Sequence, residues 1–165
     1  MRALYWRVLQ ANPELMRRVI RLASENVNSG GGGPFAALIV KDGAVVAEGV
    51  NTVFTANDPT AHAEVYAIRK ACATLGEFAL RGCIIYTSSE PCPMCLAAIY
   101  WAHLDAVYFG NGCEDAARAG FDNAYIFRQL SLERVERAIP SEQLLRDEAI
   151  ESFRLWEVSP FKREY

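Results

Sequence analysis

Two short motifs constrain this chain more than any other feature of its sequence. The first is Thr60-Ala61-His62-Ala63-Glu64, and the second, which follows residues 65–90, is Pro91-Cys92-Pro93-Met94-Cys95. Together they supply an imidazole, a pair of thiols and a carboxylate. The imidazole and the thiols are zinc ligands that would leave the fourth tetrahedral position open, which is typical of catalytic rather than structural zinc sites.

The spacing of the cysteines predicts a helix that begins at the second motif. Cys92 and Cys95 are three residues apart, so on a helix they lie on one face and can chelate one ion. Pro91 and Pro93 favour a helix start, because proline is tolerated in the first helical turn and not in the interior. Thiolates at a helix N-terminus are also favoured by its partial positive charge.

The first motif also predicts a site at the end of a helix. His62 and Glu64 are two residues apart, so they would lie on different sides of an ideal helix and converge only near its end. Asp58-Pro59-Thr60, just before them, indicates a helix start. We therefore expect two helix N-termini to meet at one zinc ion, with Glu64 beside the metal but not bound to it.

Each motif has another interpretation when it is taken alone. A lone C-x-x-C also occurs in structural zinc half-sites and redox pairs, and a lone His-x-Glu is usually a solvated helix start. In this order and on predicted helix starts, the pair favours a zinc site. A closed structural site would need a fourth ligand. The candidates are His103, Cys72, Cys83 and Cys113, but none of them stands at the short spacing from another ligand that a second chelating pair would need.

Length and composition bound the remaining possibilities. The 165 residues, 52% apolar and 22% charged, are typical of one globular domain. A net charge of −3 disfavours a nucleic-acid partner, since such proteins carry a basic face. The odd number of cysteines, five, favours a reducing compartment over a disulfide framework. Arg7 interrupts the early apolar stretch that a secretory signal needs. No apolar run reaches the roughly 20 residues of a membrane span. We expect a soluble, cytoplasmic protein without a membrane partner.

Hydrophobic periodicity and turn residues predict an α/β fold. Asp42-Gly43 is a strong hairpin signal between the first two apolar runs, and later strands alternate with helices, which is typical of parallel βαβ units. The prediction is a mixed sheet with helices on both faces. The expected strands are residues 35–40, 44–50, 84–87 and 106–110, and the expected helices begin at Asn12, Ala61, Cys92, Gly112 and Ser141.

Some segments have less specific patterns. Residues 1–11 form an apolar arm, and Gly30–Gly33 predicts a flexible connection that passes close to the active site. A phosphate-binding loop is disfavoured there, because no G-K-[ST] follows and a strand comes next. The helix capped by Ser141 carries Leu145, Ala149, Phe153 and Trp156 at helical spacing, which predicts a packed face.

A family resemblance covers most of the chain from about Phe35 onward. Residues 51–95, Ala98-Ile99-Tyr100-Trp101, Ala119-Gly120-Phe121-Asp122 and the terminal Tyr165 resemble the bacterial guanine deaminases of the cytidine deaminase superfamily. The H-x-E…P-C-x-x-C pattern by itself is the signature of zinc nucleobase deaminases. The resemblance implies a three-layer α/β/α fold with a mixed five-stranded sheet. It also implies a homodimer of single 1–165 domains in which the tail, residues 157–165, closes the partner's active site.

The resemblance also implies the roles of site residues. His62, Cys92 and Cys95 would hold one zinc ion per subunit, and Glu64 would move protons. This chain has Asn123 where the family has an acid, and a carboxylate accepts the N–H groups of guanine better than an amide does. The implied substrate-binding residues are Phe35, Asn51, Ala63, Trp101, Asp122, Asn123 and, from the other subunit, Tyr165.

The implied reaction is the hydrolysis of guanine to xanthine and ammonia. The residues alone leave other substrates open, namely cytosine, guanosine, another aminated heterocycle or adenosine in tRNA. They also leave open a zinc-stabilised domain that catalyses nothing.

Overall fold

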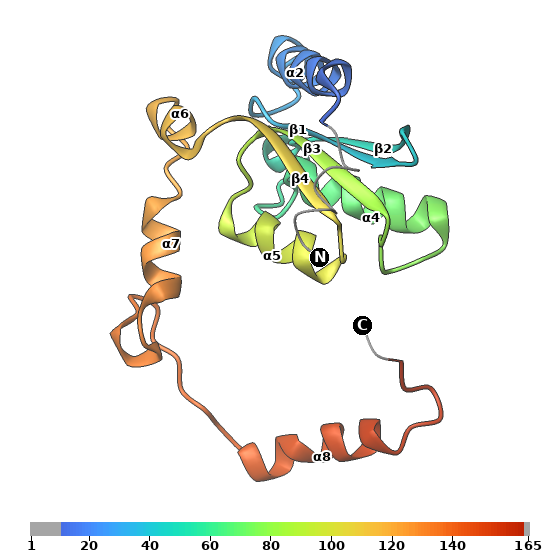
Figure 1. Ribbon diagram of the computed structural model, residues 1–165. Coiled ribbons are helices and arrows are strands. Elements are labelled where there is room, and N and C mark those ends of the chain that lie inside the picture. Colours follow the sequence, from blue (N-terminus) through green and yellow to red (C-terminus); the bar gives the residue numbers. More distant parts are fainter. Residues whose placement is uncertain (1–10, 164–165) are drawn as a thin grey trace, which may run out of the picture. The chain divides into compact units, whose positions relative to one another are not determined.

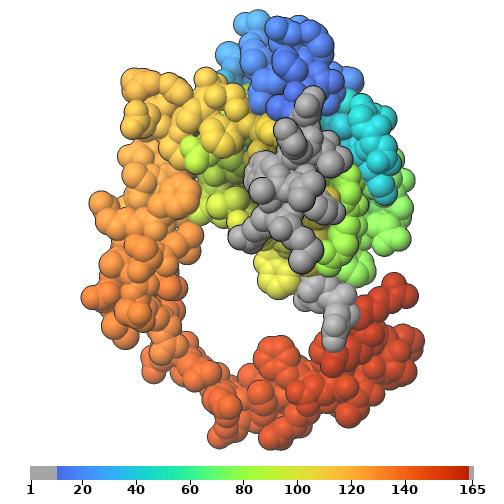
Figure 2. All heavy atoms as spheres, viewed as in Figure 1, coloured from blue at the N-terminus to red at the C-terminus, as the bar shows by residue number. Residues whose placement is uncertain are grey.

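The computed structural model describes residues 11–163, so most of the apolar arm and Tyr165 lie outside the described residues. The chain divides into two compact units, one up to Asn123 and one from Ala124, the latter drawn in orange to red in Figures 1 and 2. The first unit holds the sheet and both predicted ligand motifs. Its elements are α2 (Pro13–Asn28), β1 (Ala36–Lys41), β2 (Ala44–Val50), α3 (Val53–Ala56), α4 (Ala63–Leu75), β3 (Cys83–Ser89), α5 (Pro93–Trp101), β4 (Ala106–Asn111) and α6 (Cys113–Arg118).

The sheet is mixed, as the sequence predicts. Its strand order is β2-β1-β3-β4, with β1 antiparallel to both neighbours and β3 parallel to β4. The expected fifth strand is not present among residues 11–163, because the chain turns into α6 directly after β4 and forms only helices and coil from there to residue 163.

Helices cover both faces of this sheet and make the predicted three layers, with α2 on one face and α4 and α5 on the other (Figure 1). Strand residues alternate between the two cores. Leu38 and Tyr86 pack with Val19 of α2, while Ile39 and Ile85 pack on the other side with Ala67. Because β1 is buried on both faces, it is apolar almost throughout.

The strand directions bring distant segments to one edge of the sheet. Since β2 and β3 both run antiparallel to β1, and β4 runs parallel to β3, these three strands end at the edge where β1 begins. Phe35 precedes β1 at this edge, and Asn51, Glu90 and Gly112 follow the ends of the other strands. Both predicted ligand motifs therefore leave the sheet at the same edge.

Local signals in the sequence account for several boundaries. Asn12 caps α2, where its side-chain oxygen accepts a hydrogen bond from the backbone N–H of Glu14 at 2.9 Å. Asp42 and Gly43 have φ of 50° and 78°, the left-handed values that a tight hairpin requires. Gly76, with φ of 68°, ends α4 as a left-handed cap.

The second unit consists of α7 (Ala124–Ser131), a short 3-10 helix (Arg134–Glu136) and α8 (Arg146–Glu157). The prediction that Ser141 caps the last helix is wrong. The helix begins at Arg146, which places Asp147 and Glu148 in its first turn, where negative charge is favourable.

The predicted packing face of α8 is not buried within the chain. Leu145, Phe153 and Trp156 are 69%, 65% and 41% exposed. The prediction of a buried face is therefore wrong within the described residues, where other apolar side chains of this unit, such as Ile126 and Leu130, are also exposed. No helix among residues 11–163 is both long and apolar enough to cross a lipid bilayer.

Close packing between β2 and α4 generates the first prediction. A Cβ added at the buried Gly49 would lie 2.2 Å from the Ala63 carbonyl oxygen and 2.7 Å from the Ala67 nitrogen. Gly49→Ala should therefore lower the free energy of unfolding by about 2–3 kcal/mol, because the added methyl overpacks rigid backbone. Urea unfolding followed by circular dichroism measures the change.

Gly112→Ala is the matched control, because its added Cβ meets nothing closer than 3.8 Å and its φ is −85°. We expect it to change stability by less than about 1 kcal/mol. Equal losses in the two variants would contradict the close-packing account of Gly49.

Candidate metal centre

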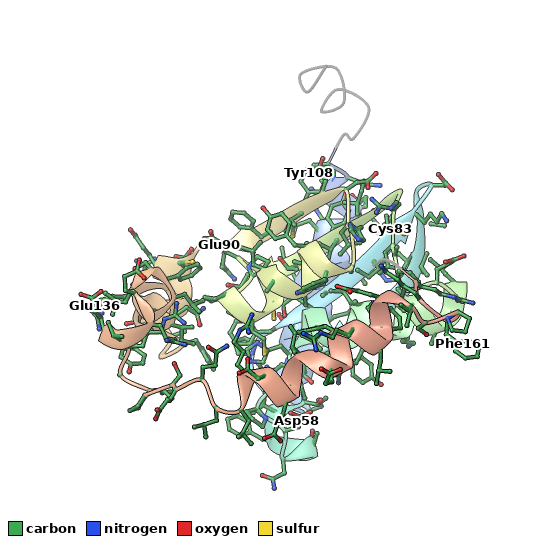
Figure 3. The ribbon with its side chains drawn as sticks, turned by 90° about the horizontal axis from the view of Figure 1, so that it is seen from below. Asp58, Cys83, Glu90, Tyr108, Glu136 and Phe161 are labelled. Atoms are coloured by element: carbon green, nitrogen blue, oxygen red, sulfur yellow. The ribbon has the colours of Figure 1, made fainter. Side chains whose placement is uncertain are left out.

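His62 stands at the N-terminus of α4. A turn closed by Asp58 (labelled in Figure 3), whose carboxylate accepts hydrogen bonds from the backbone N–H and hydroxyl of Thr60 at 2.7 Å, leads the chain into it. His62 is the N-cap residue with extended backbone (φ −74°, ψ 153°), and its side chain makes no capping bond. Its imidazole is therefore free to face the second motif instead of its own helix.

Cys92 stands in the equivalent position on α5. It is the N-cap residue (φ −64°, ψ 167°), Pro93 is the first helical residue, and Cys95 lies in the first turn. Both thiols are buried. The predicted meeting of two helix N-termini is therefore confirmed.

The distances between these side chains fit a tetrahedral zinc ion. The Nδ1 atom of His62 lies 3.6 Å from Sγ of Cys92 and 3.5 Å from Sγ of Cys95. Zinc bonds of about 2.0–2.1 Å to nitrogen and about 2.3 Å to sulfur, at tetrahedral angles, separate such ligands by about 3.5–3.6 Å. His62, Cys92 and Cys95 therefore fit one zinc ion per chain.

The described residues supply three ligands and no fourth. Among residues 11–163, no other histidine, cysteine or carboxylate forms a metal-binding group with these three side chains. Cys72 lies against the Phe78 carbonyl and Cys113 against Glu90 instead. The described side chains thus form the open set of three ligands that catalytic zinc sites use.

The surroundings of the two thiols shift their pKa values in opposite directions. A hydrogen bond from Cys95 lowers the pKa of Cys92 to about 4, despite the opposing effect of burial. Donation of a hydrogen bond to Cys92, together with burial, raises the pKa of Cys95. The hydrogen bond to Cys92 raises the pKa of His62. These surroundings favour the thiolate form of Cys92, which is the form that binds a metal ion.

Glu64 lies one residue inside α4, is 7% exposed, and its carboxyl group contacts the thiol of Cys95. Burial raises the pKa of this carboxyl, which brings it closer to neutrality than an exposed glutamate. A carboxyl of this kind accepts and returns protons readily, and it lies beside the ligands without joining them.

Some predicted substrate-binding residues lie next to the ligand motif. The backbone N–H of Thr52 donates to the Ala61 carbonyl at 3.0 Å, which ties the end of β2 to the segment that carries His62. Asn51, 6% exposed, directly precedes this link, and its backbone N–H donates to the Phe35 carbonyl at 3.0 Å. Ala63, the first residue of α4, is fully buried. Phe35, Asn51 and Ala63 therefore share the edge of the sheet with the metal ligands.

The other predicted substrate-binding residues are placed differently. Trp101 is the last residue of α5, about 12 Å along the helix axis from its start, and it lines an apolar hollow between α4 and α5 beside Phe78. Asp122 is exposed and Asn123 half-buried at the end of the first unit, just after Phe121, whose ring packs edge-on against Phe35 with centroids 4.8 Å apart. Tyr165 lies outside the described residues.

Sequence reasoning missed residues that support the ligand loop. Glu90 (labelled in Figure 3) accepts a hydrogen bond from the Cys113 backbone N–H at 3.2 Å, and its own N–H donates to the Asn111 carbonyl at 2.8 Å. The hydroxyl of Ser89 is buried with no hydrogen-bond partner in the described part of the chain. The only signal in the sequence was their position directly before Pro91-Cys92.

Comparison with known proteins gives consistent relatives. A family profile described as the cytidine and deoxycytidylate deaminase zinc-binding region matches residues 9–111. The guanine deaminase of Bacillus subtilis (strain 168) is 53% identical over 150 residues, which cover 91% of this chain and 96% of that protein. The X-ray structure of guanine deaminase from Bacillus subtilis aligns with a TM-score of 0.91 at 51% identity, over 94% of this chain and 99% of that chain.

More distant relatives match a smaller share. NE0047, solved in complex with 2,6-diaminopurine, aligns at 33% identity with a TM-score of 0.65, over 70% of this chain and 65% of that chain. The tRNA-specific adenosine deaminase of Agrobacterium fabrum is 46% identical over 77 residues, 47% of this chain and 51% of that protein. The profile match and the nearly full-length relative show that the chain belongs to the cytidine and deoxycytidylate deaminase family of zinc-dependent hydrolytic deaminases, together with the guanine deaminase of Bacillus subtilis.

Proposed function

We propose that this protein hydrolyses guanine to xanthine and ammonia. The observation that carries the proposal is the 53% identity to a guanine deaminase over 91% of the chain, joined to a complete set of ligands and a buried Glu64. Homology limited to the zinc region would favour only the superfamily, whereas this relationship includes the segments on both sides of it.

The residues supply distinct parts of the reaction. His62, Cys92 and Cys95 would hold the zinc ion, which when bound would lower the pKa of water toward neutrality. Glu64 takes a proton from the attacking water, which adds to C2 of guanine, the carbon that bears the amino group. Glu64 gives this proton to the adjacent ring nitrogen. It then takes the remaining proton of the hydroxyl added at C2 and gives it to the amino group, which leaves as ammonia as the C2–N bond breaks and the C2 carbonyl forms. Its raised pKa suits both transfers.

Recognition of the base is assigned to the edge of the sheet beside the ligands. Asn51 has donor and acceptor groups that suit the edge of a base, and Phe35 offers an aromatic face. Asp122 and Asn123 follow Phe121, which contacts Phe35. Trp101 and Tyr165 remain expected contributors from the family resemblance.

An adenosine in tRNA is the second candidate substrate, because tRNA-specific adenosine deaminases also match the zinc region. The net charge of −3 disfavours it, since phosphate binding requires basic side chains. We therefore place a free base first. The five free cysteines support a reducing, cytoplasmic location.

We also propose that the protein is a homodimer in which residues 157–165 of one copy close the site of the other. The second unit leaves large apolar side chains exposed, among them Phe153, Leu155 and Val158, at 65%, 71% and 79%. Apolar surface of this extent usually marks an interface. A second copy would bury it and complete each site with a tail.

The role of Glu64 is tested by Glu64→Gln, which keeps the shape of the side chain and removes its proton chemistry. We expect turnover to fall by about 10³-fold or more, while zinc content stays at about one ion per chain, because Glu64 is not a ligand. Ammonia release and elemental analysis measure the two quantities. Glu77→Gln, at an exposed position of the chain, is the control and should keep both the turnover and the zinc content of the wild type. Loss of zinc in Glu64→Gln would instead make Glu64 part of the metal site.

The substrate and the need for zinc are tested together. Ammonia release from guanine, guanosine, cytosine and a tRNA should be fastest with guanine and insensitive to salt, because the substrate is uncharged. Chelation of zinc should abolish ammonia release, and added zinc should restore it. The far-UV circular dichroism signal should persist, because the two hydrophobic cores on either side of the sheet do not include the metal ligands. Unfolding on chelation and no reaction with any base would favour a zinc-stabilised domain.

The swapped tail is tested by complementation between two inactive chains. One carries Glu64→Gln and the other lacks residues 157–165; each homodimer should be nearly inactive. A heterodimer purified through a different tag on each chain holds one site that has both Glu64 and a tail from the other chain. We therefore expect about half of the wild-type turnover per dimer. Closure by the chain's own tail predicts an inactive heterodimer, and sedimentation as a monomer would refute the dimer itself.

A further inference from the structure

A buried asparagine on α2 carries our inference. The inward positions of this helix are Val19, Ala23 and Asn26, which are 0%, 6% and 7% exposed. A buried amide is costly unless it is hydrogen-bonded. The Nδ2 atom of Asn26 donates to the carbonyl oxygens of Gly33 and Asn51, both at 2.9 Å. One side chain thus ties the helix to the loop before β1 and to the residue after β2.

The glycine-rich loop is packed around this amide. A Cβ added at Gly31 would lie 2.4 Å from the Oδ1 atom of Asn26, and one added at Gly32 would lie 2.2 Å from the Asn51 carbonyl oxygen. The Gly31 N–H also donates to the Asn26 carbonyl at 2.9 Å. These contacts favour glycine at both positions, since a side chain at either one would push the amide or the backbone aside.

The tied backbone segments carry both residues assigned to the base. Phe35 follows Gly33 within two residues, and the Asn51 N–H donates to the Phe35 carbonyl at 3.0 Å. The Oδ1 atom of Asn51 accepts from the Val53 N–H at 3.3 Å, which orients this side chain. Fixing the backbone at Gly33 and Asn51 therefore fixes the two walls of the proposed base pocket relative to each other.

We propose that Asn26 is a positioning residue for substrate binding, which holds Phe35 and Asn51 at the spacing that a planar base requires. The inference rests on the proposed function, in which these residues contact the base. Asn26 touches neither the metal ligands nor Glu64 in the contacts above, so its loss should weaken binding of the base and spare the chemical step. A merely structural residue would instead lower stability and leave the KM of the active enzyme unchanged.

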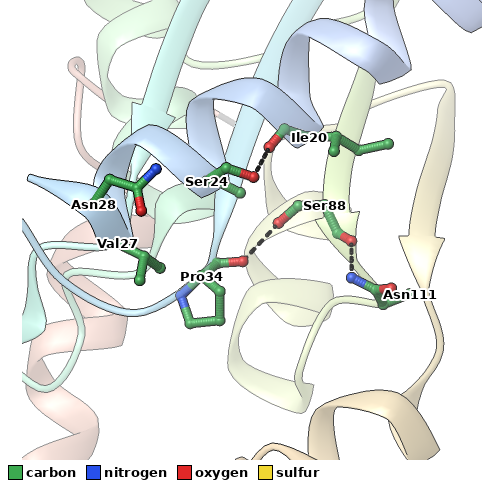
Figure 4. A pocket seen from close by; sticks show the side chains of 8 residues that line it. Ile20, Ser24, Val27, Asn28, Pro34, Ser88 and Asn111 are labelled. Carbon is green, nitrogen blue, oxygen red and sulfur yellow. Dashed lines mark hydrogen bonds between the residues drawn. The ribbon is translucent and has the colours of Figure 1, made fainter.

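The test compares Asn26→Ala with Asn28→Ala in the zinc-loaded enzyme. Asn28 lies on the same helix, is exposed, and lines a shallow hollow beside Pro34 (Figure 4). With the base that the wild type deaminates best, Asn26→Ala should raise KM about tenfold, because two buried hydrogen bonds to the pocket backbone are lost. The kcat and zinc content should stay within about twofold, and Asn28→Ala should change nothing.

A second pair of variants tests the mechanism. Gly31→Ala should raise KM to a similar degree, because its methyl displaces the Asn26 amide. In the Asn26→Ala background the same change should add less than about twofold, since the amide that it displaces is gone. Fully additive effects, or a normal KM in Asn26→Ala, would overturn the inference. A wild-type enzyme that deaminates no free base would refute the proposed function instead.

Discussion

The candidate site depends on one cluster of side chains, in which the ligand atoms of His62, Cys92 and Cys95 all lie within 4.8 Å of one another. Such a cluster of electron-pair donors is stable only if protons or a cation lie between them. Here the hydrogen bond from Cys95 lowers the pKa of Cys92, and the spacing of both thiols to the imidazole matches a tetrahedral ion. A zinc ion held by these three side chains would join the starts of α4 and α5, and Glu64, in the first turn of α4, comes from the helix that follows the imidazole.

The directions of the strands determine where the three ligand side chains come together. Because β2, β3 and β4 all end at the edge where β1 begins, the connections that carry the site residues crowd into one region. Where several connections lie side by side, their backbones come into close contact, and glycine allows this contact because it has no Cβ atom. Gly31, Gly32 and Gly49 all stand where an added Cβ would lie under 2.5 Å from another atom. The small residues around the site are thus a consequence of bringing several connections to a single edge.

The sequence predicted the parts of this structure that neighbouring residues determine. Pro93 at a helix start, the Asp42-Gly43 turn and the Asn12 cap each act within a few residues, so both ligand-bearing helices and the first hairpin were predicted correctly. The start of α8 and the exposure of its apolar face were not predicted correctly. Periodicity shows that a helix has an apolar face, but it does not show what that face packs against. The bonds from Asn26 also could not be predicted, since they join residues that only the folded sheet brings together.

The amide at position 123 does not by itself argue against guanine. A carboxylate only accepts hydrogen bonds, so it pairs with the N1–H and amino groups of the base. An amide accepts through its oxygen and donates through its nitrogen, which matches the adjacent N1–H donor and O6 acceptor of the guanine ring. If Asn123 faces the base, as the family resemblance implies, it would read the oxo group that distinguishes guanine from 2,6-diaminopurine. An acid at this position would instead pair with the N1–H and 2-amino donors of guanine, of which 2,6-diaminopurine keeps only the amino group. Either residue can therefore bind guanine, and the two differ in which atoms of the ring edge they contact.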